Sequence, residues 1–107
     1  MFLEEKLRED MKAAMRSGDV FSLGVLRMVL SALRNKSIEK RGKGLDAALT
    51  HEEVVAVLGQ EAKRRRKAAV LYREGGREDT ALLEEKEAVL IQKYLPVRKT
   101  LPRCPGL

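Results

Sequence analysis

The stretch from Thr50 to Arg73 reads THEEVVAVLGQEAKRRRKAAVLYR, and it joins a helix start, an apolar face and the densest positive charge of the chain. Thr50 and Glu53 have the spacing of a capping box, in which each side chain accepts a hydrogen bond from a free backbone amide of the first turn. Steps of three and four residues then give one mostly apolar face. That face comprises Val54, Leu58, Ala62, Arg65, Ala69 and Tyr72. The sequence therefore predicts an amphipathic helix that begins after Thr50.

Five successive cations, Lys63 to Lys67, lie within this predicted helix. Glu61 precedes Arg65 by one turn, so we expect an ion pair in the Glu-before-Arg order that suits the helix dipole. Because five cations span more than one turn, some of their stems must lie along apolar neighbours. Two interpretations remain open at this point: a solvated helix face, or a ridge that binds phosphate groups.

Length and composition indicate one domain with a modest core, built from helices. The chain has 107 residues, of which 36% are charged, and its net charge is +6. Its apolar residues are mainly Leu, Val, Ala and Met, and it has two Tyr, two Phe and no Trp, which suits helix packing better than a sandwich or barrel. A basic chain of this kind favours polyanionic partners such as RNA, DNA or an acidic protein surface.

The cysteine count and the first residues bear on the compartment. Cys104 is the only cysteine, which excludes an internal disulfide and offers no metal-ligand spacing. Glu4 and Glu5 stand where a signal peptide needs basic residues, and no run approaches the roughly 18 apolar residues of a membrane span. We therefore expect a cytoplasmic protein without a membrane segment, metal or cofactor.

Two further helices are expected before the basic one. Residues 2–17 carry an apolar stripe, and Gly18 and Asp19 then fit a C-terminal cap and the N-cap of the next helix. The stripe comprises Leu3, Leu7, Met11, Ala14 and Met15. The second helix, Val20–Arg41, is the most apolar and the expected core element, with Gly24 as the mark of a close helix crossing. Its apolar face comprises Leu23, Leu26, Leu30 and Leu33, and it is widened by Val25, Val29 and Ile38; Ser37 continues the same spacing as an optional member.

A polar ridge runs along the same second helix. Arg27, Ser31, Arg34 or Asn35, and Glu39 recur at intervals of three or four residues. The ridge is either a solvated flank of the apolar stripe or a polar groove shared with the basic helix. The sequence contains no catalytic grouping beside it that would decide between the two.

The rest of the chain supplies a loop, a final helix and a tail. Gly42 to Gly44 end the second helix, and a flexible loop is expected to Leu49. Gly75 and Gly76 stop the basic helix, acidic residues after Arg77 open a last helix, and Leu95-Pro96 ends it. Its buried side is expected from Leu83, Val89 or Leu90, Ile91 and Tyr94. The prediction is an all-α small bundle of about four helices over residues 1–96, with an extended or disordered basic tail over residues 97–107.

No catalytic constellation is recognisable in the sequence. His51, the only histidine, falls in the first turn of a helix without a nearby Cys or Ser nucleophile, so we expect a surface residue. The glycines fit neither the Walker nor the dinucleotide-binding pattern. Carboxylates such as Glu84 and Glu85 alternate with cations, as they do on a solvated helix.

Several short motifs follow one another along the chain. They are Val25-Leu26-Arg27-Met28, Ser31-Ala32-Leu33 with Asn35, Glu61-Ala62-Lys63 with the following arginines, Gly76-Arg77-Glu78-Asp79, and Tyr94-Leu95-Pro96. Together they resemble the YqeY-like family, whose domain also forms the tail of the GatB subunit of tRNA-dependent amidotransferases. The resemblance covers about residues 3 to 96.

The resemblance implies an all-helical fold and an association with tRNA. In the amidotransferase, the related tail is associated with holding tRNA while another part of the enzyme forms the amide. The family label is carbon–nitrogen ligase with glutamine as amido donor, but neither active site of that enzyme lies within this domain. Members usually continue past the Leu-Pro step with an acidic stretch and a helical subdomain of about 50 residues. We expect this subdomain to be missing here.

Charge and resemblance together suggest a non-catalytic module associated with tRNA or other RNA. We expect Lys63, Arg64, Arg66 and Lys67 to contact phosphates, with Arg27 and Asn35 as second-line polar contacts. Arg65 is assigned to structure through Glu61. The alternative is an assembly module, in which the basic helix docks on an amidotransferase-like or other acidic partner, or on a second copy of the chain.

Overall fold

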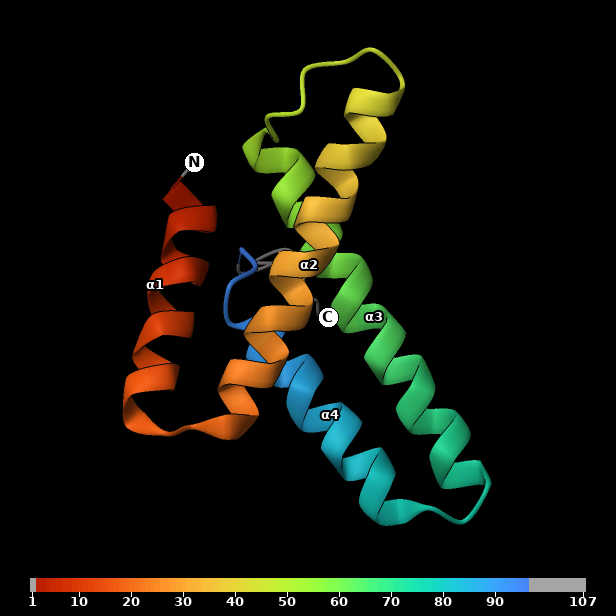
Figure 1. Ribbon diagram of the computed structural model, residues 1–107. Coiled ribbons are helices and arrows are strands. Elements are labelled where there is room, and N and C mark those ends of the chain that lie inside the picture. Colours follow the sequence, from red (N-terminus) through yellow and green to blue (C-terminus); the bar gives the residue numbers. More distant parts are fainter. Residues whose placement is uncertain (1, 97–107) are drawn as a thin grey trace, which may run out of the picture.

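The computed structural model describes residues 2–96, apart from the side chain of Phe2. Over this range the chain forms four α-helices and no strand (Figure 1): α1 (Phe2–Ser17), α2 (Val20–Gly42), α3 (His51–Glu74) and α4 (Glu78–Gln92). The predicted all-α small bundle is confirmed, and α4 ends three residues before the expected Leu95. The tail predicted over residues 97–107 lies outside the described residues.

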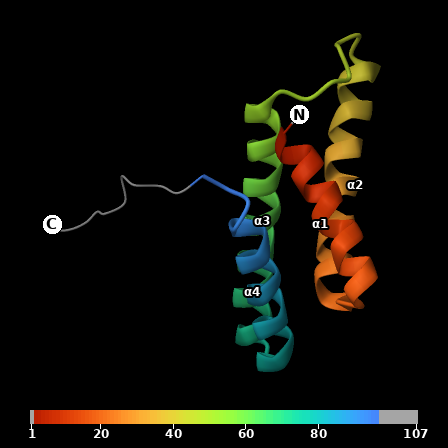
Figure 2. The same ribbon diagram turned by 90° about the vertical axis from the view of Figure 1, so that its left-hand side faces the viewer.

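The four helices form two antiparallel hairpins that are stacked as two layers. In Figure 1, α1 runs beside α2 and α3 runs beside α4, while α2 crosses α3 near the middle of the molecule. Figure 2 shows the layers from the side, with α1 and α2 in one and α3 and α4 in the other. The shortest dimension of the molecule is 26 Å, which matches two helix diameters.

Local side-chain chemistry fixes the helix ends where the sequence predicts them. Gly18 has a φ of 76°, and the Asp19 carboxylate accepts a hydrogen bond from the Ser22 amide at 3.1 Å. At the start of α3 the capping box is complete, because Thr50 Oγ1 accepts from the Glu53 amide and Glu53 Oε1 accepts from the Thr50 amide. These two predicted caps are confirmed.

Lys40 joins the two layers at the start of α3. Its Nζ lies 2.7 Å from Glu53 Oε1 and donates to the Ala48 carbonyl at 2.8 Å. The hydrogen bond from Lys40, followed by that from the Thr50 amide, lowers the pKa of Glu53 below its usual value. The end of α2 is thereby held against the beginning of α3.

Every described helix contributes to the core, and α2 contributes the most side chains to it, as predicted. The core comprises Leu3, Leu7, Val25, Leu26, Val29, Leu33, Leu49, Val54, Leu58, Ala62 and Ile91. Leu90 and Tyr94 pack against it and are partly buried. The apolar stripes read from the sequence therefore meet at the interface between the two layers.

Four expectations about individual residues are wrong. Met15, Ile38 and Leu83 were expected on buried faces and are about half exposed. Ile38 is three turns from Arg27 and shares its outward side of α2, whereas Met15 and Leu83 fall at the edges of their stripes. Gly24 marks no close crossing, because a Cβ built there meets nothing within 4 Å.

The α3–α4 contact uses alanines, and it is the most extensive contact between helices. Ala62 and Ala69 of α3 and Ala81 and Ala88 of α4 are each at most 3% exposed. We call these four residues the alanine seam. Small side chains allow two helices to pack over their full length, so the seam provides much of the shape of this hairpin.

Arg73 closes the turn between α3 and α4. Its guanidinium makes 2.8 Å ion pairs with both Glu78 and Glu85. The hydrogen bonds from Arg73 lower the pKa of both carboxyl groups and raise the pKa of Arg73 itself. This hairpin therefore has charge pairing at its turn as well as an apolar seam.

Candidate nucleic-acid interface

The run of cations in α3 is divided between an inner and an outer side of the helix. Arg65 is only 8% exposed, whereas Lys63, Arg64, Arg66 and Lys67 are all exposed. Successive residues turn by roughly 100°, so Lys63 and Lys67 lie nearly opposite Arg65, with Arg64 and Arg66 on its two flanks. This confirms the sequence-based assignment of Arg65 to structure, because the apolar stripe through Ala62 and Ala69 passes through position 65.

Arg65 lies where three helices meet. Its Nη1 donates to Glu61 Oε1 at 2.8 Å, which confirms the pair predicted from their spacing. Its Nε is 3.4 Å from Glu87 Oε1 in α4, and its Nη2 is 3.2 Å from the sulfur of Met28 in α2. Burial, followed by the charge of Glu84, raises the pKa of Glu87 against the opposing effect of Arg65. Arg65 is therefore part of the helix packing.

The exposed cations of α3 are only weakly engaged by protein groups. Arg64 is 3.3 Å from Glu61 Oε2, with 70% of its side chain exposed, and Glu61 is already paired with Arg65. Arg66 donates to the neutral amide oxygen of Gln92 at 3.3 Å. Lys63 and Lys67 make no ion pair within residues 2–96. Their charges are therefore available to an external anion.

Arg27 and Asn35 of α2 lie across from Arg64, and all three are exposed. With Ser31 and Met28 they line an open groove of about 410 Å³ between α2 and α3, which we call the α2–α3 groove. Part of the polar ridge, Arg27, Ser31 and Asn35, thus lines a groove shared with the basic helix, whereas Glu39 does not.

The other predicted contacts do not join this groove. Lys63 and Arg66 line a separate cavity of about 580 Å³ against α4, beside Gln92 and Leu95. Lys67 is exposed between the two sides and lines none of the cavities described here. The six predicted residues therefore form a ridge along α3 with a groove on one flank, and not a single pocket.

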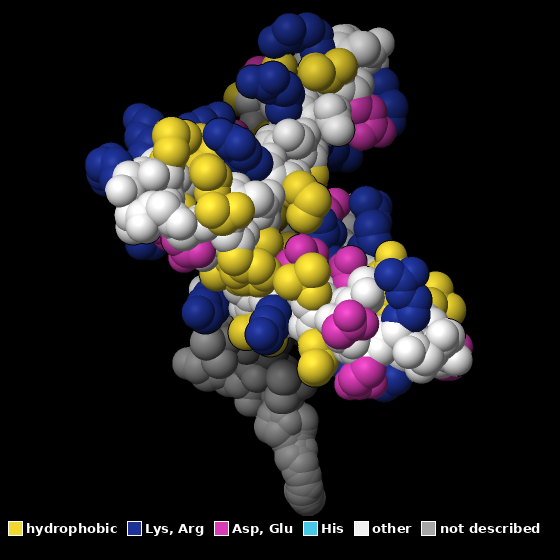
Figure 3. Space-filling model, turned by 60° about the horizontal axis from the view of Figure 1, so that its bottom comes forward, with side chains coloured by type: hydrophobic (Ala, Val, Ile, Leu, Met, Phe, Trp, Pro, Cys, Tyr) yellow, Lys and Arg dark blue, Asp and Glu magenta, His cyan; other side chains and the backbone are white. Residues whose placement is uncertain are grey.

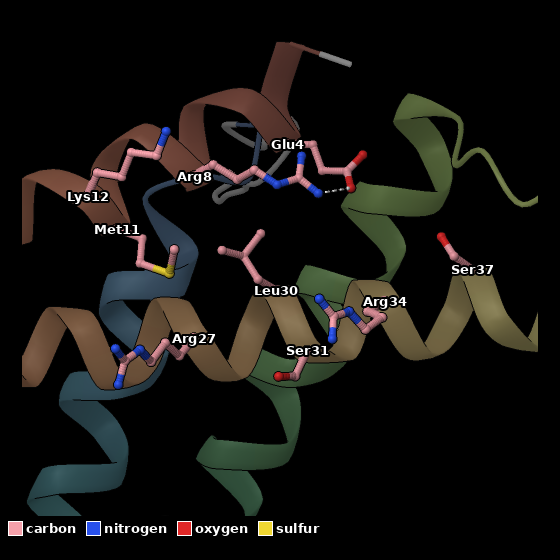
Figure 4. Close-up of a pocket in the computed structure, with 9 residues that line it drawn as sticks. All are labelled: Glu4, Arg8, Met11, Lys12, Arg27, Leu30, Ser31, Arg34 and Ser37. Carbon is pink, nitrogen blue, oxygen red and sulfur yellow. Dashed lines mark hydrogen bonds and ion pairs between the residues drawn. The ribbon is translucent and has the colours of Figure 1, made fainter. Parts of the chain in front are cut away.

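A third cavity, of about 500 Å³, lies between α1 and α2, and we call it the α1–α2 groove (Figure 4). In Figure 4, Met11 and Leu30 point into the space between the two helices, and Arg8 extends along α1 toward Glu4, at 3.4 Å. The lining comprises Glu4, Arg8, Met11, Lys12, Arg27, Leu30, Ser31, Arg34 and Ser37. Arg27 lines both this groove and the α2–α3 groove.

Sequence reasoning missed the α1 side of this groove. The apolar stripe was the feature predicted for residues 2–17, so Arg8 and Lys12 were not singled out, and Arg34 was predicted only as one member of a polar ridge. A signal was present, because Arg8, Lys12 and Arg16 recur every four residues and so share one side of α1. What the sequence could not show is that this side faces Arg27 and Arg34.

Comparison with known proteins identifies the family. A family model described as "Yqey-like protein" matches residues 4–101. The chain belongs to this family. This agrees with the resemblance drawn from its motifs, among them the Arg27-to-Asn35 segment that lines the α2–α3 groove.

Curated relatives of this YqeY-like chain come from yeasts and related fungi. "Altered inheritance of mitochondria protein 41, mitochondrial" of Eremothecium gossypii is 32% identical over 89 residues, which are 83% of this chain and 46% of that protein. The protein of the same name in Clavispora lusitaniae is 31% identical over 93 residues, 87% of this chain and 51% of that protein. The chain thus spans about half the length of these relatives.

The names of these relatives contradict the cytoplasmic setting expected from the sequence, because they describe mitochondrial proteins. The lone cysteine indicates a reducing compartment, and that criterion does not separate the cytoplasm from the interior of a mitochondrion. The acidic residues near the start bear on a secretory signal only. The cytoplasmic expectation is therefore withdrawn.

Other chemistry is sparse in the described part of the chain. His51 is exposed in the first turn of α3, which confirms it as a surface residue. Residues 2–96 contain no group of three or more His, Cys, Asp or Glu side chains that could hold a metal ion. Within the same range, no helix has the length and apolar character needed to cross a membrane. Cys104 lies outside the described residues.

Proposed function

We propose that this YqeY-like chain is a non-catalytic, RNA-associated helical module, with tRNA as the ligand to test first. The observation that supports this most is the division of the α3 cations. Arg65 is used in packing, while Lys63, Arg64, Arg66 and Lys67 remain exposed and weakly paired. Exposed cations in a row bind a phosphate backbone by releasing its condensed counterions.

Arg27 and Asn35 extend this surface across the α2–α3 groove. An arginine and an amide opposite Arg64 supply donors for phosphate or sugar oxygens. Such contacts position the nucleic acid without reading its sequence, so little base specificity is expected. A role in holding tRNA while another protein supplies the chemistry would also fit the amidotransferase relation implied by the family resemblance.

The test is equilibrium binding of labelled bulk tRNA over a salt series. The fourfold variant K63Q/R64Q/R66Q/K67Q is compared with the charge-matched control R16Q/R41Q/K86Q/K93Q, in which all four cations are exposed and lie outside the α3 ridge. On duplex, each lost phosphate contact makes the slope of log affinity against log salt concentration shallower by about 0.9, so four lost contacts change it by up to about 3.6. Circular dichroism checks that both variants keep their helices.

The expected result is a loss of affinity and slope in the α3 variant that clearly exceeds the loss in the control. Equal losses in the two variants would mean that only the net charge of the protein matters, and would overturn the assignment of α3 as the RNA-binding surface. If wild-type protein does not bind tRNA near physiological salt, the RNA function itself fails.

The competing function is an assembly module, and exposed apolar side chains favour it. Figure 3 shows such side chains gathered over the ends of both hairpins, among Lys, Arg, Asp and Glu. The exposed large apolar side chains of the described residues include Met15, Val20, Phe21, Leu71, Leu82 and Leu83. An unrelated acidic protein added in excess should displace an acidic partner from α3 and leave tRNA bound. Sedimentation at increasing protein concentration tests self-association.

A further inference from the structure

The α1–α2 groove concentrates positive charge without balancing it. Its lining holds Arg8, Lys12, Arg27 and Arg34 but only one carboxylate, that of Glu4. Glu4 lies 3.4 Å from Arg8, and the other three cations have no carboxylate within 4.0 Å among residues 2–96. Like charges held near one another repel, so this arrangement favours binding of an anion.

The same groove also presents apolar surface next to those charges. Met11 and Leu30 are only partly buried, and both point into the space between the helices (Figure 4). A phosphate group alone would leave these side chains facing water. With a volume of about 500 Å³, the groove has room for a group that is anionic at one end and flat and weakly polar at the other. A nucleotide has both parts.

We propose that the α1–α2 groove binds one unpaired nucleotide of the RNA, with its phosphate at Arg8 and Arg34 and its base over Met11 and Leu30. This inference rests on the proposed RNA function and names a second subsite for it. Unpaired bases can leave the stack and pack on protein side chains, whereas the bases of a duplex cannot.

Arg27 gives the path between the two subsites. Because it lines both grooves, a strand whose phosphates follow α3 at Arg64 can cross α2 at Arg27 and enter the α1–α2 groove. The ridge on α3 then holds the backbone of either single-stranded or duplex RNA, while the α1–α2 groove distinguishes the two.

The experiment compares a single-stranded RNA decamer with a duplex of the same length, across a salt series, on the full chain. The variant is R8Q/R34Q, and the charge-matched control is K86Q/K93Q, whose two cations are exposed and do not line the groove. For the single strand, the variant should lose about tenfold in affinity, and its slope should become shallower by about 1.4, at about 0.7 per contact. For the duplex, the R8Q/R34Q variant should lose no more affinity than the control variant does.

A second readout follows the methionine methyl groups by NMR during the same titration. The Met11 signal, assigned with Met11→Leu, should shift on adding the single strand, while that of Met15, which does not line the groove, should not. A Met11 signal that does not move at saturation overturns the nucleotide subsite, whatever the salt slopes are. If the duplex binds, and if R8Q/R34Q loses no more affinity for the single strand than the control variant does, then the nucleotide subsite is overturned and the proposed RNA function stands. If neither RNA binds the wild-type protein, the proposed function falls as well.

Discussion

The two hairpins use charged residues in opposite ways. In the α3–α4 hairpin, the alanine seam lets the helices pack extensively, and Arg65 and Arg73 each pair with a carboxylate of α4. In the α1–α2 hairpin, contact is less extensive, and the cations of the two helices surround an open groove. Arg65 and Arg73 therefore stabilise the α3–α4 hairpin, whereas most cations between α1 and α2, like Lys63 and Lys67 on the outer side of α3, are left without carboxylate partners among residues 2–96.

Removing Arg65 should have the largest effect on stability. Arg65→Ala leaves Glu87 without its arginine and Glu61 with only the exposed Arg64, in a site where the Arg65 and Glu61 side chains are about 10% exposed. Breaking a buried pair on one side costs about 3 kcal/mol of unfolding free energy. Urea denaturation measures the loss.

The matched change is Arg64→Ala, which also removes a contact with Glu61. The Arg64 side chain is exposed, so this change should lower the unfolding free energy by less than about 0.5 kcal/mol. Similar losses in the two variants would contradict the division of the cations.

Overpacking the alanine seam should have the next largest effect. Ala69→Leu adds volume at a position only 1% exposed and should lower the unfolding free energy by about 2 kcal/mol. The control is Ala13→Leu in α1, at an exposed helix position, where the change should stay within about 0.5 kcal/mol. Thermal unfolding of both variants compares the hairpins directly. A tolerated Ala69→Leu would show that the seam is not tightly packed.

The smallest effect should come from Arg73→Gln, and it should depend on pH. Arg73 holds the pKa of Glu78 and Glu85 below the usual 4.5, so these pairs stabilise the fold above that pH and lose their effect as pH falls through the lowered values. The difference between wild type and variant should therefore be largest near pH 7 and shrink toward pH 3. Both carboxylate side chains are more than 40% exposed, which keeps the effect small.

Urea unfolding of both proteins at pH 7 and pH 3 gives this comparison. Lys86→Gln on α4, which removes an exposed cation without an ion pair in residues 2–96, should differ little from wild type at either pH. A stability gap for Arg73→Gln that stays constant down to pH 3 would show that the arginine acts through packing and not through its charge.

Features encoded within one or two helix turns were predictable from the sequence. The Thr50–Glu53 capping box, the Gly18–Asp19 break and the Glu61–Arg65 pair each depend on residues at most four apart. Helix number and order follow from such signals, because caps and glycines divide the chain between amphipathic stretches. The predicted bundle was correct for this reason.

Features that depend on how helices pack were not predictable in the same way. Arg65 reaches Glu87, which is 22 positions further along the chain, and no periodicity links the two. The prediction of the buried side of α4 gave weight to Leu83 over Ala81 and Ala88, because large apolar residues dominate a helical pattern and small ones are easily overlooked. The α1–α2 groove likewise requires two polar faces from different helices, and neither face shows its partner in the sequence.

The contacts of Lys40 bear on the connection between α2 and α3, which links the two layers. Lys40 contacts both Ala48 and Glu53, which holds the far end of this connection against the end of α2. Gly44 and Leu45 at the tip are exposed, and nothing lies within 4 Å of a Cβ built on Gly44. Lengthening such a loop costs only about 0.6 kcal/mol for each doubling. The tip is therefore a site where another peptide can be inserted while both hairpins keep their arrangement.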